Sequence, residues 1–534
     1  MEKNIYNKNL KEFIIVYPPS SERAAEFPVG GLFLADSLKK RNYKCRIICD
    51  KSIDEIYLEL EKNVDKNTIG IGLSVVSTLI FKDSIKLSKE IKKRYPSIPL
   101  VWGGQAVTAQ KEQMLEFEPV DFVVVGDGED ALPDLLDSIA NNTSFSDIVG
   151  VGYKKNKKLY FNGIATKKDL EGVFKLPYDL LDVENYIRNL NIGGDRWLGA
   201  IYSRGCPFRC TFCIVSAFGS NIGTMRYHTF DHVINDLKVL TKNYHADAIT
   251  IHDDHFLINQ KRVIEFCKLV MDENIKIDFR ANGRIDSICR MEDDTLLALR
   301  KAGFVNLIAG IETGSPRYLK IMNKKLSLDQ IEIADKKLTE FGFFKHWNFM
   351  SAMPGETMED AGHTIWLMSQ LAKTSMTSTY PMSLRKFIPL PGTVMYKQAI
   401  DEFGFEEPKS LEDWAEISES YMNERSFGNA GQLDLRKRPW LSKEMGNYIQ
   451  RAEDAIEEMN ACFIGPNSDF ELIKKKVTIV ENIALETVKG ITQYTKQDFD
   501  PYPKSTKLDS SFDFRGKESS LQRSHPSQYS TNIA

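Results

Sequence analysis

The first 140 residues alternate between short apolar runs and stretches whose apolar residues recur with helical spacing. Such runs are typical of strands buried in a parallel sheet, because helices cover both of its faces. The repeated strand–helix order therefore predicts an α/β domain over residues 11–140, built on a doubly wound parallel sheet. The expected strands are residues 13–17, 45–49, 69–74, 100–104 and 122–125.

A second series of apolar runs, separated by longer helical stretches, begins near residue 199. Its six repeats predict a partial (β/α)6 barrel over residues 196–400, with an active site at the carboxyl ends of the strands. Turn-forming residues predict a connector with a small hairpin over 141–195. Helical spacing continues over 401–498, and the polar composition of 499–534 predicts a disordered tail. The expected barrel strands are residues 199–203, 248–252, 277–281, 306–310, 347–350 and 383–387.

Composition narrows the class of protein. The chain has 534 residues, which is too long for one hydrophobic core, and it is 42% hydrophobic and 27% charged. A net charge of −4 gives no basis for a nucleic-acid partner. No run approaches the roughly 18 apolar residues that a spanning helix needs, so we expect no membrane insertion. The free thiols suit a reducing cytoplasm.

Three cysteines, Cys206, Cys210 and Cys213, fall within eight residues directly after the first expected barrel strand. Thiolates at this spacing can converge on one iron–sulfur cluster. A cubane has about four irons, so three protein ligands leave one iron open to bind a small molecule. Zinc and buried structural thiols are the alternatives. Zinc would favour a fourth close Cys or His, but no His lies within ten residues of the run 204–213.

Small residues follow three expected strands of the N-terminal domain. They are Ser74, the pair Gly103 and Gly104, and the pair Gly126 and Gly128. Ligands of doubly wound sheets lie beyond the carboxyl ends of the strands. Glycine at these positions either makes the turns or lets a bulky ligand approach the backbone closely.

The cysteine motif, with Phe212 just before its third Cys, is similar to the signature of the radical S-adenosylmethionine (SAM) superfamily. The resemblance implies a 4Fe-4S cluster at Cys206, Cys210 and Cys213, whose open iron chelates the amino and carboxyl groups of SAM. One electron then cleaves SAM to a 5′-deoxyadenosyl radical, so an electron donor such as flavodoxin or ferredoxin is expected.

Several strand ends of the barrel share this resemblance. Asp253 and Asp254 resemble the segment whose backbone contacts the SAM amino group, and Glu312 lies in a motif near the ribose and methionine part of that ligand. Arg280 and Arg284 flank the end of the third strand and can pair with a carboxylate.

The N-terminal domain resembles the cobalamin-binding domain that precedes many radical SAM enzymes. The resemblance rests on Pro18-Pro19, on Pro28-x-Gly30-Gly31-Leu32, on the turn at Gly103-Gly104, and on residues 121–129, which end in Gly126, Gly128 and Glu129. It implies that these strand ends bind cobalamin. The Asp-x-His-x-x-Gly motif is absent and the domain contains no His, so cobalt would have no His ligand from it. A domain that has lost cobalamin is the alternative.

Together the two resemblances imply a radical SAM enzyme that transfers a methyl group to an unactivated carbon of a small molecule or lipid. One SAM would methylate the cobalt and another would yield the radical. The alternatives are a radical cyclisation, rearrangement or oxidation without methyl transfer, and a non-catalytic cobalamin or redox sensor. No residue identifies the substrate.

Overall fold

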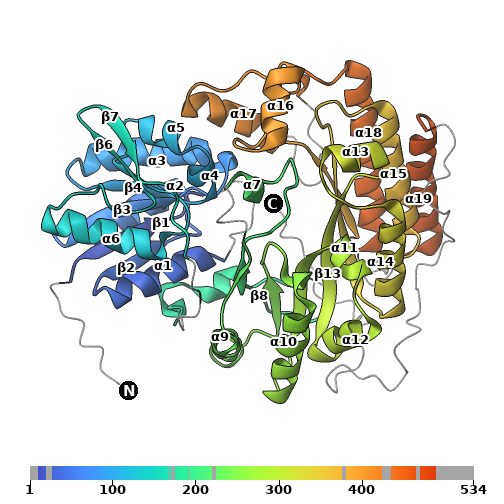
Figure 1. The fold of residues 1–534 in the computed structure, drawn as a ribbon, viewed down its shortest axis with the longest axis horizontal. Helices are drawn as coiled ribbons and strands as arrows, with labels where there is room; N and C mark the ends of the chain where they lie inside the picture. The colour runs from blue at the N-terminus through green and yellow to red at the C-terminus, as the bar shows by residue number, and fades with distance from the viewer. Residues whose placement is uncertain are drawn as a thin grey trace.

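The computed structural model describes residues 10–19, 27–167, 170, 175–190, 192–218, 224–375, 381–423, 434–464 and 469–488. The tail expected at 499–534 lies outside the described residues, as does the end of the helical region after 488. The described part forms an N-terminal sheet, a second parallel sheet, and a helical region that follows both (Figure 1).

The N-terminal sheet has seven strands in the order β2-β1-β3-β4-β5-β6-β7, and its first five strands run parallel. Side chains alternate along β1: Ile14 and Val16 pack against α2, α3 and α5, while Phe13 and Ile15 pack against α1 and α6. This arrangement confirms the expected doubly wound sheet. Its elements are β1 (Glu12–Val16), α1 (Val29–Lys40), β2 (Lys44–Ile48), α2 (Ile53–Asn63), β3 (Thr68–Ser74), α3 (Phe81–Arg94), β4 (Leu100–Gly103), α4 (Gln105–Ala109), α5 (Lys111–Glu116), β5 (Phe122–Val124) and α6 (Gly128–Asn141).

The hairpin expected in the connector extends this sheet. Its strands, β6 (Val151–Lys155) and β7 (Lys158–Phe161), pair antiparallel to each other, and β6 pairs antiparallel to β5. The sheet thus continues past residue 140, up to residue 161.

The second sheet has six parallel strands in the order β15-β14-β13-β12-β11-β8. Apolar side chains on one face, such as Phe279 and Trp347, pack against the surrounding helices. An open six-stranded half-barrel of this kind is the expected fold. Its strands are β8 (Trp197–Ala200), β11 (Ala248–Ile251), β12 (Asp278–Arg284), β13 (Phe304–Glu312), β14 (Phe344–Ser351) and β15 (Met382–Lys386), and its helices are α9 (Phe230–Asn243), α10 (Gln260–Asp272), α11 (Ile285–Cys289), α12 (Asp293–Ala302), α13 (Pro316–Ile321), α14 (Leu328–Glu340) and α15 (Met358–Ala372).

Helix starts in the half-barrel follow from local sequence. Ser327 before α14 and Thr357 before α15 each form a capping box. The hydroxyl accepts from the backbone N–H of the third helical residue, and the side chain of that third residue accepts from the backbone N–H of the Ser or Thr. These caps fix where the chain turns from each strand end into the next helix.

The C-terminal helices join the two sheets. Helices α18 (Lys443–Phe463) and α19 (Phe470–Leu485) pack beside α15, whereas α16 (Val394–Phe403) and α17 (Leu411–Asn423) return to the N-terminal domain. There Trp414 and Ile417 enter the same core as α3, and Trp414 Nε1 donates to Gln113 Oε1 over 3.1 Å. In Figure 1 this bridge crosses the top of the molecule.

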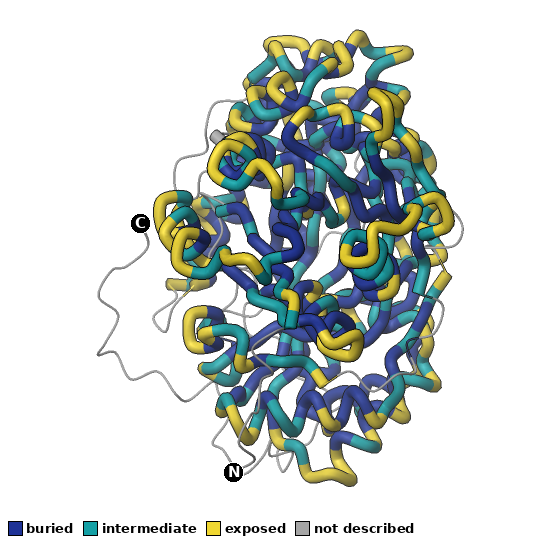
Figure 2. The backbone as a smooth tube through the Cα atoms, turned by 90° about the vertical axis from the view of Figure 1, so that its left-hand side faces the viewer, coloured by how far each residue is buried: buried dark blue, intermediate teal, exposed yellow. Residues whose placement is uncertain are grey.

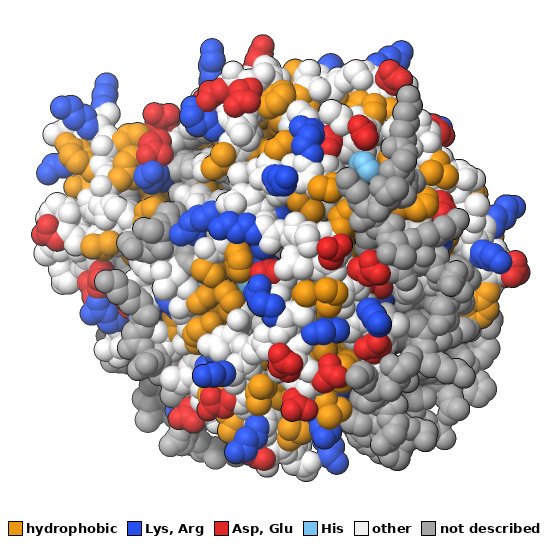
Figure 3. All heavy atoms as spheres, turned by 45° about the vertical axis from the view of Figure 1, so that its right-hand side comes forward, with side chains coloured by type: hydrophobic (Ala, Val, Ile, Leu, Met, Phe, Trp, Pro, Cys, Tyr) orange, Lys and Arg blue, Asp and Glu red, His pale blue; other side chains and the backbone are white. Residues whose placement is uncertain are grey.

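Burial follows these layers: both sheets are largely buried, and exposed residues gather on the outer sides of the helices (Figure 2). On the face drawn in Figure 3, positive and negative side chains are interspersed. Within the described residues, no helix combines the length and hydropathy that crossing a bilayer requires.

Candidate functional site

The three cysteines lie on a loop whose two ends are paired. Strand β9 (Ser203–Arg204) enters the loop, β10 (Arg226–Tyr227) leaves it, and the two pair antiparallel with Arg204 opposite Arg226. Within the loop, Cys213 precedes the short helix α7 (Ile214–Ala217). In Figure 1, α7 lies between the N-terminal sheet and the half-barrel.

The end of β11 holds the start of this cysteine loop. The Asp253 carboxylate accepts from the Tyr202 N–H over 2.7 Å and from the Ser203 hydroxyl, and Asp254 accepts from the Gly205 N–H over 3.2 Å. Burial raises the pKa of Asp253 to about 6 although these donors lower it. The side chains of Asp253 and Asp254 therefore position the loop. The SAM contact expected for this segment would then be made by its backbone.

Arg284, at the end of β12, contacts the loop directly. Its guanidinium lies 3.7 Å from the ring centroid of Phe208, and its Nη1 donates to Cys210 Sγ over 3.4 Å. Nη2 donates to the Lys324 carbonyl over 2.6 Å, and Nε pairs with Asp286 over 2.9 Å. All its donor groups are engaged within the protein, so Arg284 orients the loop and places a positive charge beside a cysteine sulfur.

Glu312 is held in an uncommon conformation at the end of β13. Its φ is +75°, in the left-handed region that side chains other than glycine rarely occupy, and its carboxylate is 2.7 Å from Lys324 Nζ in a buried pair. Gly310 leaves the space that this carboxylate occupies. Glu312 thus has a partner within the protein, and Lys324 in turn lies 5.6 Å from the ring centroid of Phe212 on the cysteine loop.

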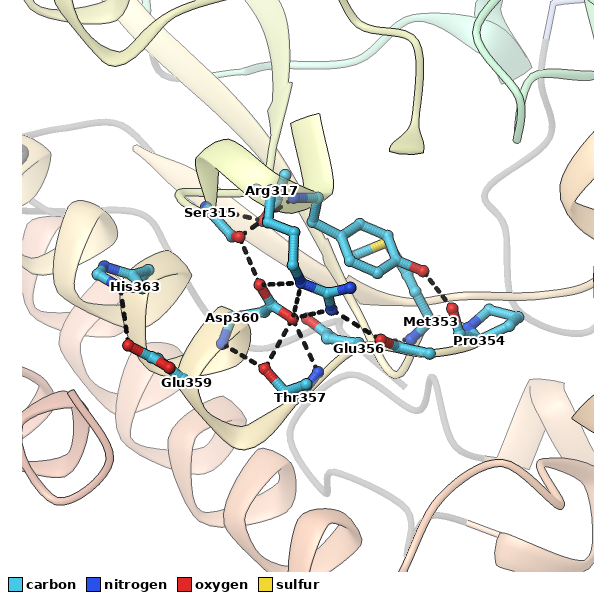
Figure 4. A network of polar contacts seen from close by, with 12 residues as sticks. Ser315, Arg317, Met353, Pro354, Glu356, Thr357, Glu359, Asp360 and His363 are labelled. Atoms are coloured by element: carbon cyan, nitrogen blue, oxygen red, sulfur yellow. Dashed lines mark hydrogen bonds and ion pairs between the residues drawn. The ribbon is translucent and has the colours of Figure 1, made fainter. Parts of the chain in front are cut away.

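The turns after β13 and β14 are joined through one carboxylate, Asp360, as Figure 4 shows. It accepts from the Ser315 hydroxyl, pairs with Arg317, and accepts from the Thr357 N–H over 2.9 Å. Arg317 Nη2 also donates to the Gly355 carbonyl over 2.8 Å. The network fixes two adjacent strand ends relative to each other.

The buried Glu356, in the turn after β14, is expected to make the stability of the protein depend on pH. Burial raises its pKa from 4.5 to about 8, against partial lowering by the Met353 N–H and Ser351 hydroxyl. The folded chain therefore keeps a proton that the unfolded chain loses, and this stabilisation is complete below about pH 4.5 and lost as the pH rises to about 8. Glu356→Gln, a permanently neutral side chain, is expected to exceed the wild type in unfolding free energy by on the order of 2–4 kcal/mol above pH 8.

Urea unfolding of both proteins at several pH values measures this difference. It should vanish near pH 4, and Glu359→Gln, at an exposed position in the first turn of the following helix α15, should show no such trend. A difference that stays constant across the range would mean that Glu356 is ionised in the folded protein.

The N-terminal sheet meets the base of the cysteine loop through four charged residues. Arg204 pairs with Glu129 and lies 3.2 Å from Asp127, which also pairs with Arg226. All four side chains are largely buried. Burial lowers the pKa of Arg204, but the two carboxylates raise it by more. The carboxyl edge of the sheet is thereby fixed against both ends of the loop, and Glu129 has a protein partner.

Family comparisons agree with both halves of this arrangement. The model of the B12 binding domain matches residues 24–136, and that of the radical SAM superfamily matches residues 200–367. The chain is a radical SAM enzyme with an N-terminal B12-binding domain.

Two relatives and one solved structure show how far this radical SAM enzyme resembles known proteins. It is 28% identical over 400 residues to an uncharacterised methyltransferase of Pyrococcus horikoshii, covering 73% of this chain and 83% of that protein. It is 25% identical over 374 residues to the anaerobic magnesium-protoporphyrin IX monomethyl ester cyclase of Rubrivivax gelatinosus, covering 67% of this chain and 65% of that protein. The radical SAM methyltransferase TsrM of Kitasatospora setae, with cobalamin and a 4Fe-4S cluster bound, aligns with a TM-score of 0.63 at 15% identity, over 90% of this chain and 99% of that one.

The domains of this radical SAM enzyme imply a 4Fe-4S cluster, SAM and cobalamin as cofactors. The donor set fits the cluster: three unpaired cysteines lie on one loop, and, in addition to burial, the nearby thiols of Cys210 and Cys206 contribute to raising the pKa of Cys213. Burial raises the pKa of Cys206, and that of Cys213 to about 11, so metal must displace their protons. Among the described residues no His, Cys, Asp or Glu side chains gather tightly enough for a single metal ion. A cubane differs, since each cysteine binds a different iron.

The small residues expected to bind cobalamin lie together, since β3, β4 and β5 are adjacent and Ser74 pairs with Gly103. The chain itself requires two of the glycines. A Cβ on Gly104, whose φ is +114°, would lie 2.6 Å from the Val75 carbonyl oxygen, and one on Gly126 would collide with the Ala165 carbonyl. On Gly128 it would lie 2.9 Å from Leu34 Cδ2. Only Gly103 has room, with its nearest neighbours 3.9 Å away.

Gly103 therefore gives the informative variant. Gly103→Leu is expected to leave the melting temperature of the cobalamin-free protein within about 2 °C, yet to weaken cobalamin binding by about tenfold or more, because the side chain extends over the strand end. Spectrophotometric titration with cobalamin measures the change. Gly104→Ala should instead destabilise the free protein. Unchanged cobalamin binding by Gly103→Leu would place the cofactor away from this edge.

Proposed function

We propose that this protein is a cobalamin-dependent radical SAM methyltransferase that acts on an unactivated carbon. When bound, the cluster supplies the electron that cleaves SAM, and cobalamin carries the methyl group. The proposal assigns the cluster to Cys206, Cys210 and Cys213 and SAM to the strand ends near Asp254 and Glu312. Cobalamin is assigned to the edge formed by Ser74, Gly103, Gly104, Gly126 and Gly128.

One observation carries the proposal: Arg204 and Arg226, at the two ends of the cysteine loop, both pair with the residues that follow β5. A methyl carrier and a radical generator must face one substrate, and these contacts bring the two edges together. A sensor that only binds cobalamin would need no strand ends ordered around a SAM site. The methyltransferase name of the Pyrococcus relative supports the same reaction.

The protein's own residues supply position and charge. Asp253 and Asp254 fix the entry of the loop, and Arg284 donates to the sulfur of Cys210. Lys324, which is paired with Glu312, lies beside the ring of Phe212 on the same loop. A loop fixed at several points keeps the reacting groups in a productive geometry, where a misplacement of about 1 Å costs roughly 100-fold in rate.

The test uses anaerobic, reconstituted and reduced protein with SAM carrying a deuterated methyl group. With cobalamin, we expect both 5′-deoxyadenosine and S-adenosylhomocysteine, and without cobalamin only 5′-deoxyadenosine. Adding a small-molecule extract of the source cells should yield a product bearing the deuterated methyl group. If cobalamin-loaded protein makes 5′-deoxyadenosine but never S-adenosylhomocysteine, methyl transfer is refuted in favour of cyclisation, rearrangement or oxidation.

A further inference from the structure

The inner face of the half-barrel is polar, in contrast to its outer face. Residues on β11 to β14 alternate, so that apolar side chains such as Phe279 and Leu307 enter the helix-covered core while their neighbours point inward. On β14 and β15 the inward residues hydrogen-bond across the sheet: Ser383 donates to Asn348 Oδ1 over 2.8 Å, and His346 Nε2 lies 3.1 Å from that oxygen. On β11 to β14 the inward polar residues include Thr250, Arg280, Asn282, Asn306, His346 and Asn348.

Arg280 is the cation of this inner face. It lies in the third position of β12, with Thr250 and Asn306 beside it on the neighbouring strands. Among the described residues its side chain makes no hydrogen bond or ion pair, and its Nε is buried without a partner. Burial lowers the pKa of Arg280 to about 10, and no carboxylate opposes this effect. Arg280 is half-buried, and a charge that is removed from water without a partner is costly.

A second unpartnered group lies next to it. Asn306 is 2% exposed, and its Oδ1 is buried without a hydrogen bond. The nearest carboxylate on the same face of β12, Asp278, accepts from the Gly194 N–H over 2.7 Å at the bottom of the barrel. Trp197, Ala248, Val305 and Phe344 form a separate apolar cluster at that end. A ligand therefore reaches Arg280 from the strand ends, where the cysteine loop lies.

We propose that Arg280 binds an anionic group, a carboxylate or a phosphate, of the substrate. This inference rests on the proposed function, since it places the substrate between the cysteine loop and the floor of the barrel. Arg284, which lies beside Cys210, is four residues after Arg280 along β12, a span of about 13 Å. The substrate is thus an elongated polar molecule whose anion lies about this far from the reacting carbon. Thr250 and Asn306 flank Arg280 at its own level, and Asn282 lies two residues closer to the cysteine loop, so all three offer neutral hydrogen-bonding groups to the substrate.

The test compares the full reconstituted chain with Arg280→Met and Arg280→Gln. Inorganic phosphate and acetate, each against chloride at equal ionic strength, are the two probes, and melting temperature and calorimetric binding are the readouts. One probe or the other should stabilise the wild type, and both variants should lose at least tenfold in its affinity. Which probe binds distinguishes phosphate from carboxylate. Arg280→Met should also melt about 2–4 °C higher than the wild type without anion, because it removes an uncompensated charge.

Arg451→Gln, which breaks an exposed pair with Glu486, is the matched control and should bind the probes like the wild type. SAM binding and 5′-deoxyadenosine formation are measured on the same samples. Variants that keep both but no longer bind the anion support the proposal. If neither probe binds the wild type while it forms 5′-deoxyadenosine, the substrate site is refuted and the radical chemistry stands. A loss of SAM affinity in Arg280→Gln would also overturn the proposal, by assigning Arg280 to the SAM carboxylate.

Discussion

Replacing Cys206, Cys210 or Cys213 by alanine is expected to lower the iron content of the anaerobically reconstituted protein from about four per chain to less than one. Each thiolate binds a different iron, so the loss of one leaves two irons of a cubane without a protein ligand, and the cluster dissociates. SAM-dependent formation of 5′-deoxyadenosine should disappear with it. Iron and sulfide analysis, with electron paramagnetic resonance of the reduced protein, measures the cluster directly.

The matched controls are cysteines outside the loop. Cys267 is fully buried in α10, and burial raises the pKa of its thiol far above its usual range. Cys267→Ala and Cys289→Ala should keep the iron, although the first opens a small cavity. A chain that loses its iron in Cys267→Ala but keeps it in Cys210→Ala would refute the motif assignment. If the wild type instead shows the spectra of a single bound metal ion, the three cysteines form a mononuclear site and not a cluster.

The fold was predictable from the sequence because both sheets alternate strongly with amphipathic helices. The errors concern strand ends and have a physical cause. The sequence predicts that the third barrel strand ends at residue 281, whereas β12 continues to Arg284. It predicts that the fourth strand begins at residue 306, whereas β13 begins at Phe304. At the end of β12, polar residues such as Asn282 point toward the inside of the barrel, so they interrupt the apolar run that reveals a strand.

The candidate site was predictable where its residues are close in the sequence and not where they meet across domains. The cysteine spacing is local. By contrast, Arg204 meets Glu129 from 75 residues away, and no local pattern marks the pairing of Asp127 with Arg226. Charged residues that flank a motif are usually solvated, so their pairing depends on how the domains pack. The same applies to Gly104 and Gly126, where only the folded chain shows that neighbouring carbonyls fill the space.

The contact of Arg204 with the N-terminal domain leads to a second large expected effect. Arg204→Gln removes the partner of Glu129, whose side chain is 4% exposed, and so leaves a buried carboxylate uncompensated. Breaking a buried pair in this way is expected to cost about 3–5 kcal/mol of unfolding free energy. The double variant Arg204→Gln/Glu129→Gln removes both charges of this pair, so it should regain much of the lost unfolding free energy. Urea unfolding of the apoprotein measures both variants. The control is Arg451→Gln, which breaks an exposed pair with Glu486 and should cost less than about 1 kcal/mol.

The double variant also separates the two activities of the proposed reaction. Its cysteines are intact, so it should bind the cluster and form 5′-deoxyadenosine at a rate close to that of the wild type. S-adenosylhomocysteine formation requires the two domains in register and should fall by about tenfold or more, since a displacement of about 1 Å is enough to slow a transfer step strongly. If the double variant is as unstable as Arg204→Gln, the uncompensated carboxylate is not the cause of the instability. If it makes both products at the wild-type rate, the charged contact holds the domains together without setting the distance that methyl transfer requires.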